Sequence, residues 1–256
     1  MLRVANCLLG EDLGDDTLII GTSGRYEFKN KGIDVFLESL NRLNRDKDLK
    51  KKVLAFVNVP SWVGDPREDL QKRLKSKDKF TEPLQCPFIT HWLHNMTHDQ
   101  VLDMLKYLGM GNRPEDKVKV IFVPCYQDGH DGILNKHYYD LILGEDLSVY
   151  PSYYEPWGYT PLESVAFRVP TITTDLAGFG LWVNSLKNQH GINDGVEVLH
   201  RSDYNYSEVA DGIKDTVALF STKTEAEIKE IRKRAGQVAE QALWKHFIQY
   251  YYEAYD

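Results

Sequence analysis

The residues with the most evident chemistry lie in one short segment, YEPWGYTPLE, which runs from Tyr154 to Glu163. It places two carboxylates, Glu155 and Glu163, on either side of a turn that contains proline and glycine. Thr160, Pro161 and Glu163 fit the N-cap, N1 and N3 positions of a capping box, so a helix is predicted to start here. A helix N-terminus offers free N–H groups and a positive dipole end, which suit an anion such as a diphosphate. On this pattern alone, Glu163 could equally be only a capping residue and Glu155 an ordinary loop acid.

A second segment carries cations at the end of a predicted strand. Leu18 to Ile20 form a short apolar run, which suits a parallel strand buried on both faces. Apolar residues at helical spacing follow between Ile33 and Leu43. Gly24, Arg25 and Lys31 lie between these elements, at the C-terminal end of the strand, where open α/β sheets bind ligands. Arginine suits bidentate contact with phosphate and lysine supplies a point charge, so the pair is a candidate for holding a diphosphate.

The remainder of the chain alternates predicted strands and helices, which is typical of a parallel, doubly wound α/β sheet. The further strands are expected at Val53–Val59, Val118–Pro124, Leu147–Tyr150, Thr171–Thr174 and Gly195–His200. The further helices are expected within Asp65–Lys79 and at Asp99–Leu108, Thr160–Phe167, Tyr206–Phe220 and Glu225–Tyr255.

Together, the two chemical segments resemble the signatures of the animal and fungal type of glycogen synthase. The matching strings are SGRYEFKNKG (Ser23 to Gly32), PSYYEPWGYTP (Pro151 to Pro161), VKVIFVP (Val118 to Pro124), TITTDLAGFG (Thr171 to Gly180) and the closing helix around Trp244. Members of this family are retaining glycosyltransferases of the GT-B type, in which two Rossmann-like domains face each other across a cleft. The resemblance implies that this chain is the C-terminal, nucleotide-sugar-binding half of such an enzyme, with a long C-terminal helix.

The resemblance also implies roles for single residues. Arg25 and Lys31 contact the diphosphate, and Glu155 lies near the sugar hydroxyls at the reacting end, so these three form the implied catalytic set. Glu163 binds the ribose hydroxyls. Tyr138, or its neighbour, stacks on the uracil ring. The other implied donor-binding positions are Gly24, Trp157, Gly158, Tyr159 and Thr160.

The reaction implied by the resemblance is transfer of glucose from UDP-glucose to the non-reducing 4-hydroxyl of an α-1,4-glucan, with retention. Retention would follow from departure of UDP on the face that the acceptor attacks, steered by Arg25 and Lys31, without a metal, a cofactor or a covalent intermediate. Two alternatives stay open. One is a non-catalytic nucleotide-sugar-binding or scaffolding module, and the other is a retaining glycosyltransferase with another donor or acceptor.

The domain organisation follows from the same resemblance, because family members carry an N-terminal acceptor-side domain that nothing here matches. We expect residues 1–16 to be a linker from that missing domain, and residues 17–222 to be the Rossmann-like domain, with a helical insertion near 60–116. Residues 223–256 form the expected C-terminal helix, whose aromatic stripe could support self-association as a homo-oligomer. The isolated chain is expected to bind nucleotide but to be inactive.

Composition excludes several classes of partner. A net charge of -7 and a pI near 5.6 argue against nucleic acid or an anionic membrane surface, because both call for a basic face. No apolar run approaches the roughly 20 residues of a membrane span. The 3 cysteines are too few and too irregularly spaced for a disulfide framework, so a reducing, cytoplasmic setting is expected.

One further motif has a metal-binding alternative. His91, His94 and His98, with Cys86 just upstream, could be drawn as a zinc site because histidines at these offsets can share a helical face. Pro87 places the segment in or near a loop, however. We therefore predict structural or surface histidines and no metal.

Overall fold

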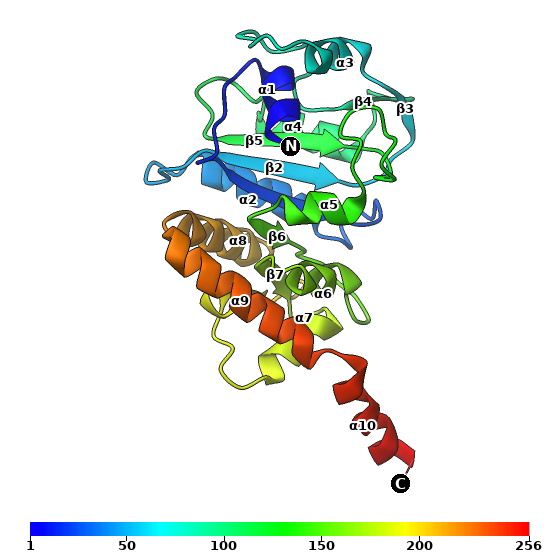
Figure 1. Cartoon of the computed structure of the whole chain (residues 1–256), viewed down its shortest axis with the longest axis vertical. Helices are drawn as coiled ribbons and strands as arrows, with labels where there is room; N and C mark the ends of the chain where they lie inside the picture. Colours follow the sequence, from blue (N-terminus) through cyan, green and yellow to red (C-terminus); the bar gives the residue numbers. More distant parts are fainter. Residues whose placement is uncertain (256) are drawn as a thin grey trace.

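A computed structural model describes residues 1–255 and contains a sheet of 6 strands in the order β5–β2–β1–β6–β7–β8. All neighbouring strands in it run parallel. The strands are β1 (Leu18–Ser23), β2 (Val53–Asn58), β5 (Val118–Val123), β6 (Leu147–Val149), β7 (Thr171–Thr174) and β8 (Val196–Leu199). The chain builds from β1 to β2 and β5 and then returns to β6 on the other side of β1 (Figure 1). This confirms the predicted doubly wound topology.

The sequence of β2 shows why the sheet lies in the middle of the molecule. Val53, Ala55 and Val57 pack into one layer of the core, whereas Leu54 and Phe56 pack into the layer on the opposite face. All of them are fully buried. Side chains of a strand alternate between faces, so a strand that is covered on both sides reads as one continuous apolar run.

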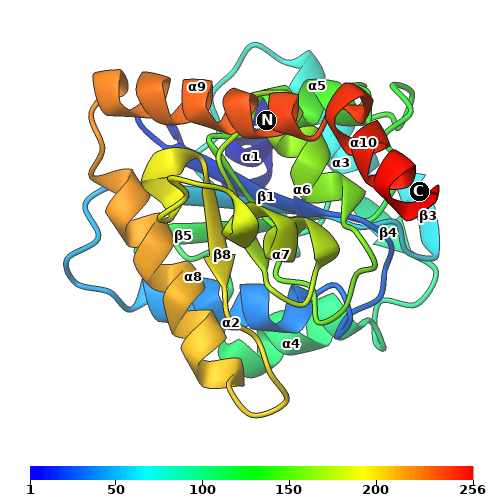
Figure 2. The ribbon, with the colours of Figure 1, turned by 90° about the horizontal axis from the view of Figure 1, so that it is seen from below.

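Helices cover both faces of this sheet (Figure 2). One face is covered by α2 (Ile33–Asn44), α4 (Gln100–Leu108) and α8 (Tyr206–Ser221). The other face is covered by α1 (Leu2–Leu9) and α3 (Glu68–Lys75) near β2 and β5, and by α6 (Tyr159–Ala166), α7 (Gly178–Ser185) and α9 (Glu225–Gln241) near β8. The short α5 (Tyr138–Leu143) connects β5 to β6.

The first residues of the chain differ from the expected linker. Leu2–Leu9 form α1, whose Val4, Cys7 and Leu8 are buried in the core layer that also holds Leu54 and Phe56. The helix ends at Gly10, which has a left-handed φ of 66°. This segment is part of the domain, because its apolar face packs against the core layer that contains residues of β2.

The segment between β2 and β5 contains more than the expected helices. Besides α3 and α4, it holds a small antiparallel pair of strands, β3 (Val63–Pro66) and β4 (His91–Leu93). The fully buried Arg67 joins the two sides of this segment, because its guanidinium donates to the carbonyl oxygens of Cys86 and Ile89 and pairs with Asp69 at 2.8 Å. A buried arginine is tolerated there because its donors are satisfied.

The expected C-terminal helix is present but divided. It breaks at Ala242 and Leu243 into α9 and a second helix, α10 (Trp244–Tyr255), which projects from the body of the domain (Figure 1). No residue of α10 is buried, and several of its aromatic side chains are more than half exposed. Among residues 1–255, no helix combines the length and the apolar character needed to cross a lipid bilayer.

Candidate functional site

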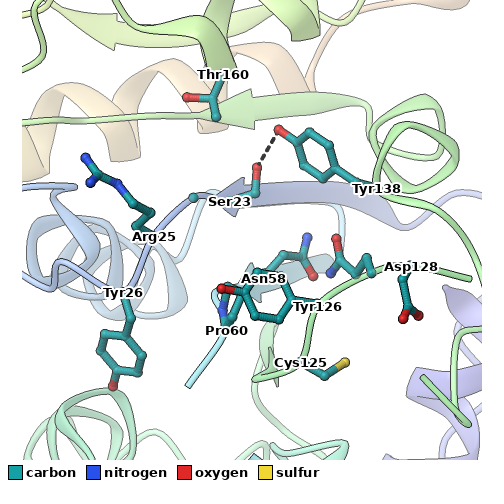
Figure 3. Close-up of a pocket in the computed structure, with 12 residues that line it drawn as sticks. Ser23, Arg25, Tyr26, Asn58, Pro60, Cys125, Tyr126, Asp128, Tyr138 and Thr160 are labelled. Atoms are coloured by element: carbon teal, nitrogen blue, oxygen red, sulfur yellow. Dashed lines mark hydrogen bonds between the residues drawn. The ribbon is translucent and has the colours of Figure 1, made fainter. Parts of the chain in front are cut away.

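A cavity of about 460 Å³ opens at the C-terminal ends of β1, β2 and β5 (Figure 3). Residues that end these strands or follow them form its wall, including Ser23, Asn58 and Cys125. Thr160 contributes from the start of α6, on the other side of β1. The chain reverses its direction of winding between β1 and β6, so the cavity lies beside the topological switch point, where open α/β sheets bind ligands.

The loop after β1 approaches the loop after β6 very closely. Gly32 starts α2 with a left-handed φ of 68°, and a Cβ atom there would overlap the carbonyl oxygen of Pro151. Only glycine permits both the backbone conformation and the contact. The backbone N–H of Tyr153 also donates to the carbonyl oxygen of Asn30 at 2.7 Å. The two loops are therefore held together by backbone, independently of their charged side chains.

This contact brings together two predicted catalytic residues that are far apart in the sequence. The ammonium of Lys31 forms an ion pair with the Glu155 carboxylate, and only 15% and 16% of the two side chains is exposed. Burial lowers the pKa of the Lys31 ammonium, while the nearby carboxylate of Glu27 acts in the opposite direction. A lysine with three donors can bridge a carboxylate and a second oxygen ligand.

The predicted Arg25 lies in the wall of the cavity, but it is not locked in place. Its side chain is 78% exposed and its guanidinium pairs with Glu27 at 3.0 Å. A surface pair of this kind contributes little to stability because water screens both charges. Among the described residues, the Arg25 side chain is therefore held only by this exposed ion pair. Gly24, also predicted, lines the cavity next to it.

The start of α6 corrects the predicted capping box. The N-cap is Gly158, with φ 105°, so Thr160 and Pro161 are the second and third helical residues and no side chain caps this helix. Proline is tolerated anywhere in the first turn, because N–H groups there have no acceptor within the helix, and this allowed the register to be misread. The first turn of α6 still faces the cavity through Thr160, while Tyr159 beside it is 73% exposed.

Glu163 does not cap α6 and instead faces α5. Its carboxylate accepts a hydrogen bond of 3.1 Å from the hydroxyl of Tyr139. Tyr138, which precedes Tyr139 in α5, lines the cavity. The Tyr138 hydroxyl lies 3.0 Å from the Ser23 hydroxyl (Figure 3). Burial raises the pKa of the Tyr138 hydroxyl, which keeps it neutral. Of the two tyrosines considered for base stacking, Tyr138 is therefore the one in the cavity wall.

Trp157 is placed away from the wall of this cavity. Its indole contacts Phe179 and Trp182 of α7, with ring centroids 5.9 and 5.8 Å away. It also packs edge-on against Phe247 of α10 at 5.6 Å. The side chain thus anchors the loop between Glu155 and α6 to α7 and α10.

Several residues that line the cavity were not predicted from the sequence, among them three with polar or aromatic side chains that suit a ligand. Asn58 is the last residue of β2, and Tyr126 and Gln127 follow β5. Asn58 interrupts an otherwise apolar run at a strand end, which is where the binding rule for open sheets would have pointed. Tyr126 is 78% exposed and offers an aromatic face.

The three histidines of the possible zinc motif do not meet. His91 is buried in β4, His94 packs against the ring of Trp62 at 4.8 Å, and His98 is exposed. Because His94 and His98 lie beyond the end of a short strand and not on a helix, their spacing does not align them with His91.

His91 instead lies near Cys125 and Asp131, and one potential ligand atom of each lies within 4.8 Å of the others. The ligand atoms of His91 and Asp131 already have protein partners. His91 Nε2 lies 2.7 Å from the carbonyl oxygen of Asp131, so Nε2 carries the proton, and Nδ1 accepts from Thr90. The Asp131 carboxylate accepts backbone N–H groups of residues 133–135. Burial raises the pKa of the Cys125 thiol to about 12, so it is neutral. We therefore assign the cluster a structural role.

Comparison with known proteins gives a consistent family. A family model for glycogen synthase matches residues 9–67 and 67–256. The glycogen [starch] synthase of Neurospora crassa is 28% identical over 94% of this chain, and isoform 2 from Saccharomyces cerevisiae is 29% identical over 90% of it. The glycogen [starch] synthase of Caenorhabditis elegans is 32% identical over 73% of the chain. The aligned part spans 41% of each of the two fungal relatives and 35% of the nematode relative.

Solved structures agree on the fold. The glycosyltransferase WaaG, involved in lipopolysaccharide biosynthesis, superposes with a TM-score of 0.50 over 89% of this chain and 44% of its own, at 14% identity. The pneumococcal O-GlcNAc transferase GtfA, solved with UDP and GlcNAc, gives a TM-score of 0.51 over 93% of this chain and 35% of its own, at 13% identity. These likenesses confirm the predicted fold class.

Proposed function

This chain belongs to the glycogen synthase family, and from that membership we propose that it is the nucleotide-sugar-binding part of a retaining glucosyltransferase. In this proposal, glucose passes from UDP-glucose to the 4-hydroxyl at the non-reducing end of an α-1,4-glucan. The observation that carries the proposal is that Arg25 and the first turn of α6 line one cavity, while the Lys31–Glu155 pair lies beside Gly24 and joins the loop after β1 to the loop after β6.

Each of these groups has a task in the proposed reaction. As the bond between the sugar and the diphosphate breaks, negative charge grows on the leaving UDP. Fixed cations and N–H dipoles that face this charge lower the barrier. Arg25 and Lys31 supply the cations, and the N–H groups of Tyr159 and Thr160 supply the dipoles at the positive end of α6.

The position of the Lys31–Glu155 ion pair has a physical reason. Before the donor binds, the carboxylate of Glu155 satisfies an ammonium that is largely removed from water. When the diphosphate arrives, Lys31 has donors for both partners, and the Glu155 carboxylate is then available to accept from sugar hydroxyls. Glu163 lies on the α5 side, where we propose that its carboxylate accepts from the ribose hydroxyls in place of the Tyr139 hydroxyl.

The chain spans about two fifths of the fungal relatives it matches, so we propose that acceptor binding and turnover require groups outside it. The span described here would then bind UDP without transferring glucose. The α-1,4-glucan would bind across the cleft from the cavity.

Isothermal titration of this chain with UDP and with uridine tests the proposal. Arg25→Ala is expected to weaken UDP binding by about 1.5–3 kcal/mol, the range for hydrogen bonds to charged groups, and to leave uridine binding unchanged. Lys29→Ala is the matched control, because it removes the same charge from an exposed site in the same loop. Equal losses for UDP and uridine would make Arg25 structural, and a wild-type chain that binds no UDP would overturn the proposal. If UDP binds but the full-length protein transfers no glucose to glycogen, the chain is a binding module.

A further inference from the structure

Two buried amide groups in the cavity lack hydrogen-bond partners. The side chain of Asn58 is only 5% exposed, and its Oδ1 atom is fully buried. The Nε2 atom of Gln127 is also buried. Within residues 1–255 neither atom has a partner, and both residues line the same cavity. One unpaired acceptor and one unpaired donor therefore belong to two residues that line the same cavity.

The surrounding backbone fixes where these two amides lie. Asn58 pairs with Ser23 of β1 on one side and with Val123 of β5 on the other, so it stands at the middle of the strand ends. The carbonyl oxygen of Gln127 accepts the backbone N–H of Tyr138 at 3.1 Å, which places Gln127 beside the cavity tyrosine. Both amides are thus carried by backbone that is hydrogen-bonded to neighbouring segments.

Unpaired buried amides cost free energy in the unliganded protein. Buried polar groups in folded proteins are nearly always hydrogen-bonded, and each exception calls for a reason. A ligand that offers a donor to Asn58 and an acceptor to Gln127 would remove both costs in one step. A leucine at position 58 would fill a similar volume without the cost, so packing alone does not account for the amide.

The position of the proposed phosphate contacts indicates which part of a nucleotide would reach the amides. Figure 3 shows Arg25 and Thr160 on one side of the strand end at Ser23, and Asn58 with Tyr126 on the other. A diphosphate held by Arg25 and α6 directs its nucleoside toward Asn58. The aromatic rings of Tyr126 and Tyr138 there suit the face of a base, and the amides suit its edge.

We propose that Asn58 and Gln127 read the hydrogen-bonding edge of the uracil ring and so determine the choice of donor nucleotide. Asn58 Oδ1 accepts the N3–H of the base, and Gln127 Nε2 donates to the adjacent O4. The inference rests on the proposed function, since it assigns the base end of the same nucleotide site. A site whose buried polar groups match a substrate discriminates strongly against an analogue that leaves them unpaired.

The test uses near-isosteric variants, Asn58→Leu and Gln127→Met, and three probes: UDP, 3-methyl-UDP and inorganic pyrophosphate. Each variant should bind UDP about tenfold more weakly, as expected for the loss of one buried hydrogen bond, with pyrophosphate binding unchanged. The wild-type chain should bind 3-methyl-UDP about tenfold more weakly than UDP, because the methyl group replaces N3–H, and Asn58→Leu should bind the two equally. The unliganded Asn58→Leu protein should melt no lower than wild type.

The outcomes separate this inference from the proposed function. Wild-type binding of both UDP and pyrophosphate, with UDP affinity retained in both variants, would overturn only the base-reading role. Parallel losses of UDP affinity and pyrophosphate affinity in the variants would do the same, since the effect would then not be specific to the base. A wild-type chain that does not distinguish UDP from 3-methyl-UDP would refute the assignment of Asn58 without any variant. Absence of all nucleotide and pyrophosphate binding would overturn the proposed function itself.

Discussion

Substitution of Gly32 by alanine would test whether the close approach of two loops builds the site. Gly32 has a φ of 68°, and an added Cβ would overlap the Pro151 carbonyl oxygen and lie 2.8 Å from the Arg201 guanidinium. A left-handed conformation costs a non-glycine residue about 1–2 kcal/mol. Overpacking against backbone adds about 1–3 kcal/mol. Gly32→Ala should therefore lower the free energy of unfolding by about 2–5 kcal/mol.

Gly109 provides a matched control within the same chain. Its φ is 69°, almost the same, but no atom of the described residues lies within 4 Å of the position a Cβ would take. Gly109→Ala should therefore lose only the conformational part, about 1–2 kcal/mol. Urea unfolding followed by circular dichroism measures both values. UDP affinity should fall only in Gly32→Ala, because the altered loop moves Lys31 away from Glu155. Equal losses of stability in the two variants would refute the argument that loop contact matters.

Three further predictions follow from other parts of the structure. In the full-length protein, Glu155→Gln should lower turnover far more than UDP affinity and Glu163→Gln should do the reverse; steady-state kinetics and calorimetry would show the opposite order if the assignments are wrong. Light scattering should find that the chain self-associates through the exposed aromatic face of α10 and that a Tyr251→Glu/Tyr255→Glu double variant is monomeric, whereas a monomeric wild type would contradict this. Burial raises the pKa of Glu145 from 4.5 to about 8, so stability should fall as the pH rises from about 4.5 to about 8 and level off above that. Urea unfolding across this range should give a flatter profile for Glu145→Gln, and identical profiles would show that the carboxyl is not the cause.

The strands and their order of winding follow from local signals. Runs such as Val53–Val57 are apolar along their whole length, which only a sheet covered on both faces requires. Such a run indicates by itself that both faces of the strand are buried, so its neighbours need not be known. The helices α2, α4 and α8 were equally evident, because each carries one apolar stripe that matches a helical period.

Other elements depend on contacts that no local pattern reveals. Residues 2–9 form a helix because their apolar face meets the layer around Phe56, which lies on a distant strand. The capping-box pattern predicts that α6 starts at Thr160, but the N-cap is Gly158, so the helix starts earlier. Proline fits either register, so the ambiguity lies in the sequence itself.

The candidate site shows the same division. Arg25, Lys31 and Glu155 could be selected because charged residues at strand ends and helix starts have few structural reasons to be there. Gln127 could not be selected in this way, because a single amide is common in any loop, and Asn58 carries only the general signal of a polar residue at a strand end. Their significance appears only when the folded chain leaves one atom of each without a partner.

The way β1 joins its two neighbours has a mechanical consequence. β1 pairs with β2 along residues Leu18 to Ser23, but its register with β6 includes only Ile20 and Gly21. The ladder between β1 and β6 is therefore short, and the polypeptide before α5 is joined to the polypeptide after it by this ladder, by the backbone contact of the two loops and by side-chain packing. The cavity lies at this junction, with Ser23 at the end of β1 on one side and Thr160 at the start of α6 on the other. A nucleotide bound as proposed would contact both sides of the cavity, and its binding free energy would then oppose local separation of the two halves as well as global unfolding.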